Sequence, residues 1–213
     1  ANEAYLKAPN AEGNATNGDE FGYKVSISSD TAIVSAWRED SNQTTITNGT
    51  ITQASDIGAN DNGAVYVFKR TGSTWVNEAY LKAPNSEAAD FFGKSISILG
   101  DTIVVGANGE DSNQTTITNG TTNAGNGASN TGAAYVFKRT GITWSNEAYL
   151  KASNSQTGDS LGSSVSISGD TIVVGAINED SNQTTITNGS IVTDNNLATD
   201  SGAVYVFRRV SKD

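Results

Sequence analysis

The sequence predicts an all-β protein built from three copies of one four-stranded unit, and three observations support this prediction. The eleven letters EDSNQTTITNG occur three times and begin at residues 39, 110 and 179, so that one unit is about 70 residues long. Short apolar runs alternate along the chain with clusters of Gly, Asn, Asp and Ser. The periodicity of an amphipathic helix is absent. Self-similarity of this kind indicates a repeat architecture.

Each unit contains four runs with strand character, which in the second unit cover residues 93–99, 102–107, 133–139 and 146–152. The first run alternates apolar and polar residues. The second and third runs are apolar on both faces, as is typical of strands covered on both sides. The fourth run carries charged residues on one face, which is expected of an outer strand that is half in water.

Four antiparallel strands with covered inner members and a charged outer member describe the blade of a β-propeller. A β-solenoid is the alternative, but its rungs are usually shorter and parallel. Recurrent glycines at the start of each unit are expected where the backbones of adjacent sheets converge. The predicted array consists of an outer strand at 2–8, blade 1 at about 19–83, blade 2 at about 90–152 and blade 3 at about 159–209.

The motifs at the two ends of each unit give a family resemblance. A Phe-Gly or Leu-Gly pair at 21–22, 92–93 and 161–162 precedes a β run that ends in SA or GA, and GAVYVF or GAAYVF closes the unit. In these motifs the chain resembles the FG-GAP repeats of integrin α-subunit propellers, and more closely those of bacterial FG-GAP repeat proteins. The resemblance covers essentially the whole chain and implies β-propeller blades.

Integrin-type repeats often carry a D-x-D-x-D-G calcium hairpin between the two motifs. Here that link is SSD at 28–30, LGD at 99–101 and SGD at 168–170. Calcium typically takes about six to eight oxygen ligands, and one Asp in a tight turn cannot supply them. The calcium hairpin of the family is therefore not expected in this chain.

The two ends of the sequence predict an incomplete third blade. The chain opens on the outer-strand motif NEAYLKA at 2–8 and ends shortly after a third-strand motif at 202–209. Because closed propellers have about four to eight blades, three blades do not close alone. We therefore expect a head-to-tail homo-oligomer in which the 2–8 strand of one molecule pairs with the 202–209 strand of another. The residues expected at this contact are Asn2, Ala4, Leu6, Val204 and Val206.

Two assemblies follow from such a contact. A ring forms if the rotation between molecules closes, and a filament forms if it does not. We favour a six-bladed ring of two chains over a filament. The alternative is that the sequence is an excised part of a larger propeller.

A long connection separates the second and third strands of each unit and runs from 110 to 131 in the second one. It is longer than a plain hairpin loop. In the first unit, TTIT and TIT flank Asn48-Gly49 within residues 44–52, which is a strong hairpin signal because both turn residues tolerate positive φ. We expect each unit to project a Thr-rich β-arm, and such surface segments often carry binding sites.

Acidic, amide and aromatic side chains in or beside these arms are the candidate binding residues. Carboxylates beside a turn suit calcium, although such groups more often bond to backbone amides or to water. The candidate calcium ligands are Glu39, Asp40, Glu110, Asp111, Glu179 and Asp180. Trp37 is a candidate sugar-stacking platform, with packing against the arm as the alternative. The other candidate ligand contacts are Asn42, Asn113 and Asn182.

The composition excludes several classes of function. With 13 basic and 23 acidic residues, the net charge of −10 repels nucleic acids and anionic membranes. The chain has no Cys and no His, and therefore lacks thiolate metal sites, cysteine nucleophiles and the commonest general base. No apolar run approaches the roughly 20 residues that span a bilayer. No nucleophile elbow or phosphate loop is present either, so we expect a non-catalytic protein.

The chain begins at Ala1 and contains no Met, from which we expect a secreted protein whose leader has been removed. A polar, acidic, cysteine-free composition is in keeping with an extracellular or cell-surface location. The sequence thus predicts a module for self-assembly and for surface or ligand binding. The alternative is a lectin-like or adhesive propeller that binds a glycan or a surface protein.

Overall fold

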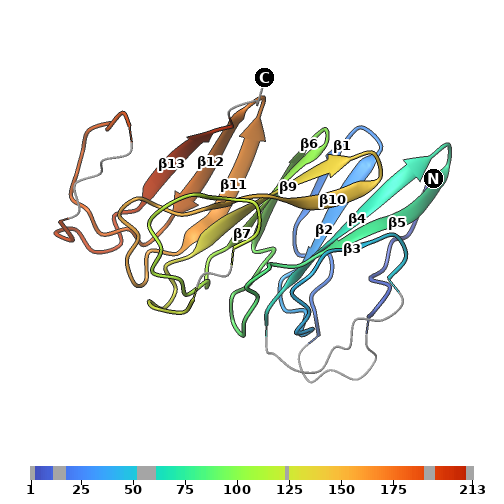
Figure 1. Ribbon diagram of the computed structural model, residues 1–213, viewed down its shortest axis with the longest axis horizontal. Coiled ribbons are helices and arrows are strands. Elements are labelled where there is room, and N and C mark those ends of the chain that lie inside the picture. The colour runs from blue at the N-terminus through green and yellow to red at the C-terminus, as the bar shows by residue number, and fades with distance from the viewer. Residues whose placement is uncertain (1–2, 12–17, 52–60, 123–124, 190–194, 210–213) are drawn as a thin grey trace.

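The computed structural model describes residues 3–11, 18–51, 61–122, 125–189 and 195–209. Within these ranges the regular secondary structure is β-strand only, arranged as three antiparallel sheets that follow one another in chain order. The sheets lie side by side along the long axis of the molecule (Figure 1). No helix that could cross a membrane occurs in these ranges. The all-β prediction is confirmed, and the three sheets match the three predicted units.

Sheets 1 and 2 share one strand order, whereas sheet 3 is shorter. Sheet 1 runs β1 (Val25–Ser28), β2 (Thr31–Ala36), β4 (Ala64–Thr71), β5 (Thr74–Leu81) and β3 (Thr47–Asn48). Sheet 2 runs β6 (Ser95–Leu99), β7 (Thr102–Ala107), β9 (Ala133–Thr140), β10 (Thr143–Leu150) and β8 (Thr118–Asn119). Sheet 3 runs β11 (Leu161–Ser168), β12 (Thr171–Ala176) and β13 (Ala203–Arg208). A single chain therefore forms an open array that ends at β13, and not a closed ring (Figure 1).

Apolar cores fill the spaces between adjacent sheets. Ile33 of sheet 1 and Ile103 of sheet 2 belong to one buried cluster, and Val104 of sheet 2 and Ile172 of sheet 3 belong to the next. Because β7 lies between the two clusters, all six of its residues are buried. This explains why the second run of the unit is apolar on both faces.

Glycines allow the sheets to approach each other closely. Gly132 and Gly162 have φ of 75° and 90°, in the left-handed region that favours glycine. A Cβ on Gly132 would lie 2.1 Å from the carbonyl oxygen of Leu161, and one on Gly162 would lie 2.2 Å from that of Ala133. The expectation that glycines at the start of each unit mark converging backbones is confirmed at Gly162, whereas a Cβ on the equivalent Gly22 would meet nothing within 4 Å.

The predicted β-arms are wrong in their geometry. The described part of this segment, residues 44–51, does not form a projecting hairpin about Asn48-Gly49. Instead β3 pairs with β5, and the equivalent β8 pairs with β10, so that the first two arms each add a short fifth strand to their own sheet. In the described residues the third arm adds no strand to sheet 3. The amide of Gly49 donates to the carbonyl of Glu78 at 2.7 Å. The backbone N–H and C=O groups of β3 thus pair with the edge of β5. In the predicted hairpin they would have paired within the arm. Residues 52–60 lie outside the described ranges.

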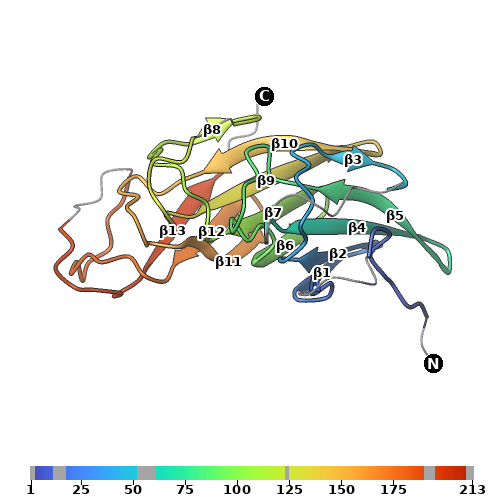
Figure 2. The same ribbon diagram turned by 90° about the horizontal axis from the view of Figure 1, so that it is seen from below.

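The predicted outer strand at 2–8 is not a strand within this chain. Residues 3–8 have no ladder partner, and Leu6 and Ala8 pack on an apolar cluster of sheet 1 that includes Tyr66. Asn2 lies outside the described residues. Extended chain becomes a strand only when its backbone groups are paired, and β13, its predicted partner, lies at the opposite end of the molecule (Figure 2).

Candidate functional site

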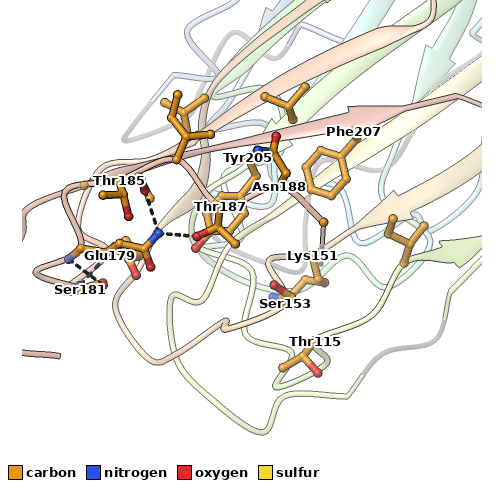
Figure 3. A pocket seen from close by; sticks show the side chains of 18 of the residues that line it. Thr115, Lys151, Ser153, Glu179, Ser181, Thr185, Thr187, Asn188, Tyr205 and Phe207 are labelled. Carbon is orange, nitrogen blue, oxygen red and sulfur yellow. Dashed lines mark hydrogen bonds between the residues drawn. The ribbon is translucent and has the colours of Figure 1, made fainter. Parts of the chain in front are cut away.

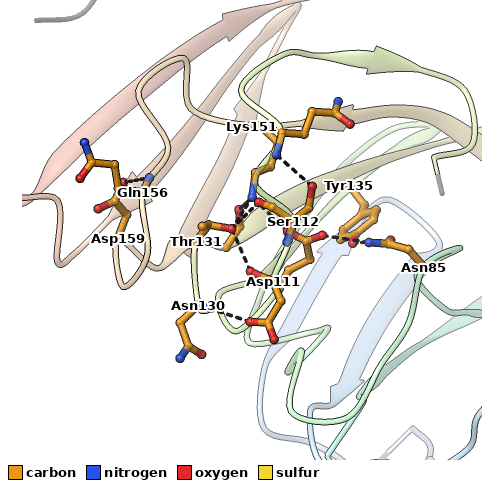
Figure 4. A network of polar contacts seen from close by, with 12 residues as sticks. Asn85, Asp111, Ser112, Asn130, Thr131, Tyr135, Lys151, Gln156 and Asp159 are labelled. Carbon is orange, nitrogen blue, oxygen red and sulfur yellow. Dashed lines mark hydrogen bonds and ion pairs between the residues drawn. The ribbon is translucent and has the colours of Figure 1, made fainter. Parts of the chain in front are cut away.

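A buried carboxylate recurs at the start of the EDSNQTTITNG motif. Glu39, Glu110 and Glu179 follow the second strands of their sheets, with exposed fractions of 0%, 1% and 5%. In sheets 1 and 2 this carboxylate binds a buried lysine that comes directly after the fourth strand. The distance is 2.8 Å from Lys82 Nζ to Glu39 Oε2 and 3.0 Å from Lys151 Nζ to Glu110 Oε2. Figure 4 shows the polar network around Lys151.

An asparagine and a tyrosine complete each cluster. The asparagine precedes the first strand of the sheet, and its Nδ2 donates to Oε1 of the glutamate. The hydroxyl of a tyrosine in the third strand donates to Oδ1 of the same asparagine. These bonds of 2.6–3.1 Å join Asn10 to Glu39 and Tyr66, Asn85 to Glu110 and Tyr135, and Asn154 to Glu179 and Tyr205. Each sheet thus has the same hydrogen-bonded cluster of glutamate, asparagine and tyrosine, which is fully or partly buried.

Lys151 uses all three of its donor positions. Besides Glu110, Lys151 Nζ donates to Thr131 Oγ1 and to the carbonyl of Gly132, both at 2.6 Å. Burial lowers the pKa of Lys151, and the attraction of Glu110 opposes that shift. A buried ammonium needs such a set of acceptors, because an unpaired charge in the interior is costly.

The third cluster is open. Glu179 keeps its bonds from Asn154 Nδ2 at 2.9 Å and from the backbone amide of Ser181 at 3.2 Å, but no cation pairs with it in the described part of the chain. In the described ranges sheet 3 has no fourth strand, which in sheets 1 and 2 brings a tyrosine and a lysine. In its place is a groove of about 1330 Å³, lined by β13, Glu179 and the threonine-rich segments at 115–117 and 183–189 (Figure 3).

The N-terminal segment sits where a fourth strand would precede sheet 1. An arginine at the end of each third strand pairs with a glutamate of the sheet before it: Arg139 with Glu78 at 2.9 Å and Arg209 with Glu147 at 2.8 Å. Arg70 makes the same contact with Glu3 at 3.2 Å. Residues 3–8 belong to no sheet, and therefore Tyr5 and Lys7 of this NEAYLKA motif pack in none of the three clusters. Tyr5 is 85% exposed, and Lys7 is exposed as well.

Comparison with known families explains the repeated geometry. Three consecutive stretches, at residues 11–68, 75–137 and 144–207, match the family described as FG-GAP repeat. The chain belongs to the FG-GAP repeat family. No curated protein matches the chain.

The FG-GAP matches are out of phase with the sheets. The second match begins at residue 75, within β5, and the third begins at 144, within β10, although these strands belong to sheets 1 and 2. The second and third FG-GAP repeats therefore each contribute their first strand to the sheet before them.

The acidic pairs of the FG-GAP repeats, predicted as calcium ligands, have other partners. Glu39 and Glu110 bind lysines, while the aspartates hold the ends of the long connections. Oδ1 of Asp40, Asp111 and Asp180 accepts the backbone amides of Asp61, Asn130 and Asp200, each at 2.7 Å. Within the ranges that the structure describes, no group of three or more acidic residues is placed to hold a metal. Calcium binding stays a prediction.

Trp37 was predicted as a sugar-stacking platform or as an aromatic packed against the arm, and in the structure it packs on residues outside the arm. Its ring is 9% exposed and lies between Tyr23 and Phe91, with Lys94 Nζ 3.3 Å from the ring centre. Its Nε1 donates to Glu20 Oε2 at 2.7 Å. A sugar cannot stack on a ring covered in this way. The amides predicted as ligand contacts, Asn42, Asn113 and Asn182, are exposed.

The sequence analysis missed the lysine, tyrosine and asparagine of the polar cluster. A signal was present, because NEAYLKA supplies a lysine to every outer strand and EDSNQTTITNG supplies a glutamate to every unit. A lysine and a glutamate that recur together in a repeat indicate an ion pair between them. Only the strand register shows that Lys151 and Glu110 meet, although they are separated by 41 residues.

Proposed function

We propose that this FG-GAP repeat protein is a non-catalytic module that assembles head to tail. Residues 3–8 of one molecule add a fourth strand to sheet 3 of the next. One observation supports this above all: the sequence that completes sheets 1 and 2 occurs a third time at the far end of the chain, without a sheet. An unpaired edge such as that of β13 is a template for another strand.

The exposed apolar residues support the same proposal. Val25 and Ile27 of β1 are 70% and 64% exposed, whereas Ile98, equivalent to Ile27, is 6% exposed at the contact of sheets 1 and 2. Val206 of β13 is 68% exposed, whereas its equivalent Val136 is 1% exposed. The first and last sheets thus carry the same faces that are buried inside the array. Stacking one molecule on the next would bury them.

A six-bladed ring of two chains is the favoured product, because each chain supplies three sheets and one donor strand. A filament forms if the rotation between molecules does not close. Light scattering coupled to size exclusion distinguishes these products from a monomer of 22.1 kDa. We expect twice the chain mass for the ring and a broad, heavier distribution for the filament. A monomer at micromolar concentration would overturn the proposal and favour an excised part of a larger propeller.

A pair of variants ties the association to the open face. Val206→Asp places a charge on the exposed face of β13 and should give a folded monomer. Ile142→Asp makes the same kind of change in the β9–β10 turn, where Ile142 is 81% exposed, and should leave the mass unchanged. If both variants assemble to the same extent, sheet 3 is not part of the contact between molecules.

A second candidate function is recognition of a glycan or a surface protein outside the cell. It is favoured by the exposed Asn and Thr residues of three equivalent segments, which a ring or filament would present many times over. Glycan-array binding and secretion of the full-length product test it. Absence of binding in the assembled state, or retention of the product inside cells, would speak against this function.

A further inference from the structure

We infer that Glu179, Asn154 and Ser201 form a preformed receptor for Lys7 of a second copy of this chain, and that this contact fixes the register of the donated strand. The inference rests on the proposed head-to-tail assembly and specifies how one molecule recognises the next. Its basis is that two complete copies of the receptor, with their lysines bound, occur in the same molecule.

The acceptors of the open receptor are already in place. In sheet 2, Thr131 Oγ1 bonds to the carbonyls of Glu110 and Ser112 at 3.0 and 2.7 Å while it accepts Lys151. In sheet 3, Ser201 Oγ makes the same two bonds, to the carbonyls of Glu179 and Ser181, at 3.0 and 2.6 Å. Gly202 stands where Gly132 supplies its carbonyl to Lys151. What sheet 3 lacks among the described residues is the fourth strand, which brings the lysine ammonium group and a tyrosine to the complete clusters.

The strand register of the complete sheets predicts the register of the contact. Tyr149 pairs with Tyr135 in sheet 2, as Tyr80 pairs with Tyr66 in sheet 1. By their places in the repeat, Tyr5 pairs with Tyr205 and Ala4 with Val206. Lys7 then follows Tyr5 by two residues, as Lys151 follows Tyr149, and reaches the open carboxylate.

The buried charge makes this register selective. A slip of one residue turns every side chain to the opposite face of the sheet. Lys7 would then point away, and Glu179 would be sealed beneath the new strand without a counter-ion. A strand without lysine at this position has the same defect. The receptor therefore selects the NEAYLKA strand over other extended segments, because a buried unpaired charge is costly.

Mixing two assembly-deficient variants tests the inference. Lys7→Glu spoils the donor strand but keeps the receptor, and Glu179→Lys spoils the receptor but keeps the donor. We expect each variant alone to be monomeric and their equimolar mixture to form a one-to-one heterodimer, because one wild-type contact is available between them. Recovery on mixing also shows that both variants are folded. Lys138→Glu makes the same charge change as Lys7→Glu on β9 and should assemble like the wild type.

The milder variant Glu179→Gln keeps the shape of the side chain and should weaken self-association at least about tenfold in sedimentation equilibrium. If the wild type assembles and Lys7→Glu, Glu179→Lys and Glu179→Gln assemble equally well, the lysine receptor is wrong while strand donation stands. If the wild-type chain is itself monomeric, the proposed function fails and the receptor fails with it.

Discussion

At the scale of single residues, the most informative feature is one glutamate seen in two states. Glu110 is buried with a lysine, whereas Glu179 is buried to nearly the same degree and has no cation among the residues described. Both accept a bond from an asparagine at 2.9 Å. The two residues therefore form an internal comparison of a complete and an open site.

This comparison gives a first prediction. Glu110→Gln keeps the side-chain shape but leaves the ammonium of Lys151 buried without a counter-ion, so the free energy of unfolding should fall by about 3–5 kcal/mol. Glu179→Gln strands no lysine and should cost about 1 kcal/mol. Urea denaturation of dilute protein, below the concentration at which chains associate, measures both values. If both variants lose the same free energy of unfolding, the ion pair between Lys151 and Glu110 does not contribute to stability.

A second prediction concerns pH. Asp90 is 3% exposed, and burial raises the pKa of its carboxyl group to about 8. An unfolded Asp has a pKa of about 3.9, so between about pH 4 and pH 8 the folded chain holds a proton that the unfolded chain has released. The free energy of unfolding should therefore fall as pH rises through this range. Asp90→Asn should make the decline shallower in urea titrations at several pH values, and an unaltered slope would contradict this assignment.

At the scale of elements, the sequence predicts strands well where both partners are local. The predicted run at 102–107 coincides with β7, and the run at 133–139 differs from β9 by one residue, because these strands carry an apolar pattern that only a doubly covered sheet satisfies. The arm at 44–52 was wrong because its partner, the edge of β5, exists only in the folded sheet. The Asn-Gly turn signal is local, so it could not show that the edge of β5 would pair with this segment in place of its own second half.

The same distinction applies to the candidate site. The acidic residues at its centre were identified from their repetition, but as calcium ligands and not as partners of lysine. Their side-chain partners are 25 to 43 positions away, such as Asn85 for Glu110 and Lys82 for Glu39. Such contacts depend on the register of β5 and β10, which periodicity alone does not supply.

A third prediction separates close packing from backbone strain. Gly22 and Gly162 are equivalent and have φ of 100° and 90°, but a Cβ would meet nothing within 4 Å at Gly22 and backbone at 2.2 Å at Gly162. Gly162→Ala should therefore cost at least about 2 kcal/mol more than Gly22→Ala, since both share the strain and only one is overpacked. Denaturant unfolding measures the difference. Similar losses would mean that the sheets can separate slightly without cost.

At the scale of the whole molecule, the two ends of the array are complementary. One end carries the exposed Tyr5 and Lys7, and the other carries the open edge of β13 with Glu179 at its rim. The net charge of −10 opposes non-specific association, so a contact between copies depends on local complementarity at these ends. The proposed assembly would also bury the exposed apolar faces of the first and last sheets.

Cross-linking across the proposed strand pair tests head-to-tail donation most directly, because the natural chain contains no cysteine. The variant Ala4→Cys with Val206→Cys places two thiols opposite each other in the predicted register, whereas Tyr5→Cys with Val206→Cys places them on opposite faces. After mild oxidation at micromolar concentration, non-reducing electrophoresis should show linked chains for the first pair and single chains for the second. Single chains for both pairs, or equal linkage in both, would contradict head-to-tail donation in this register.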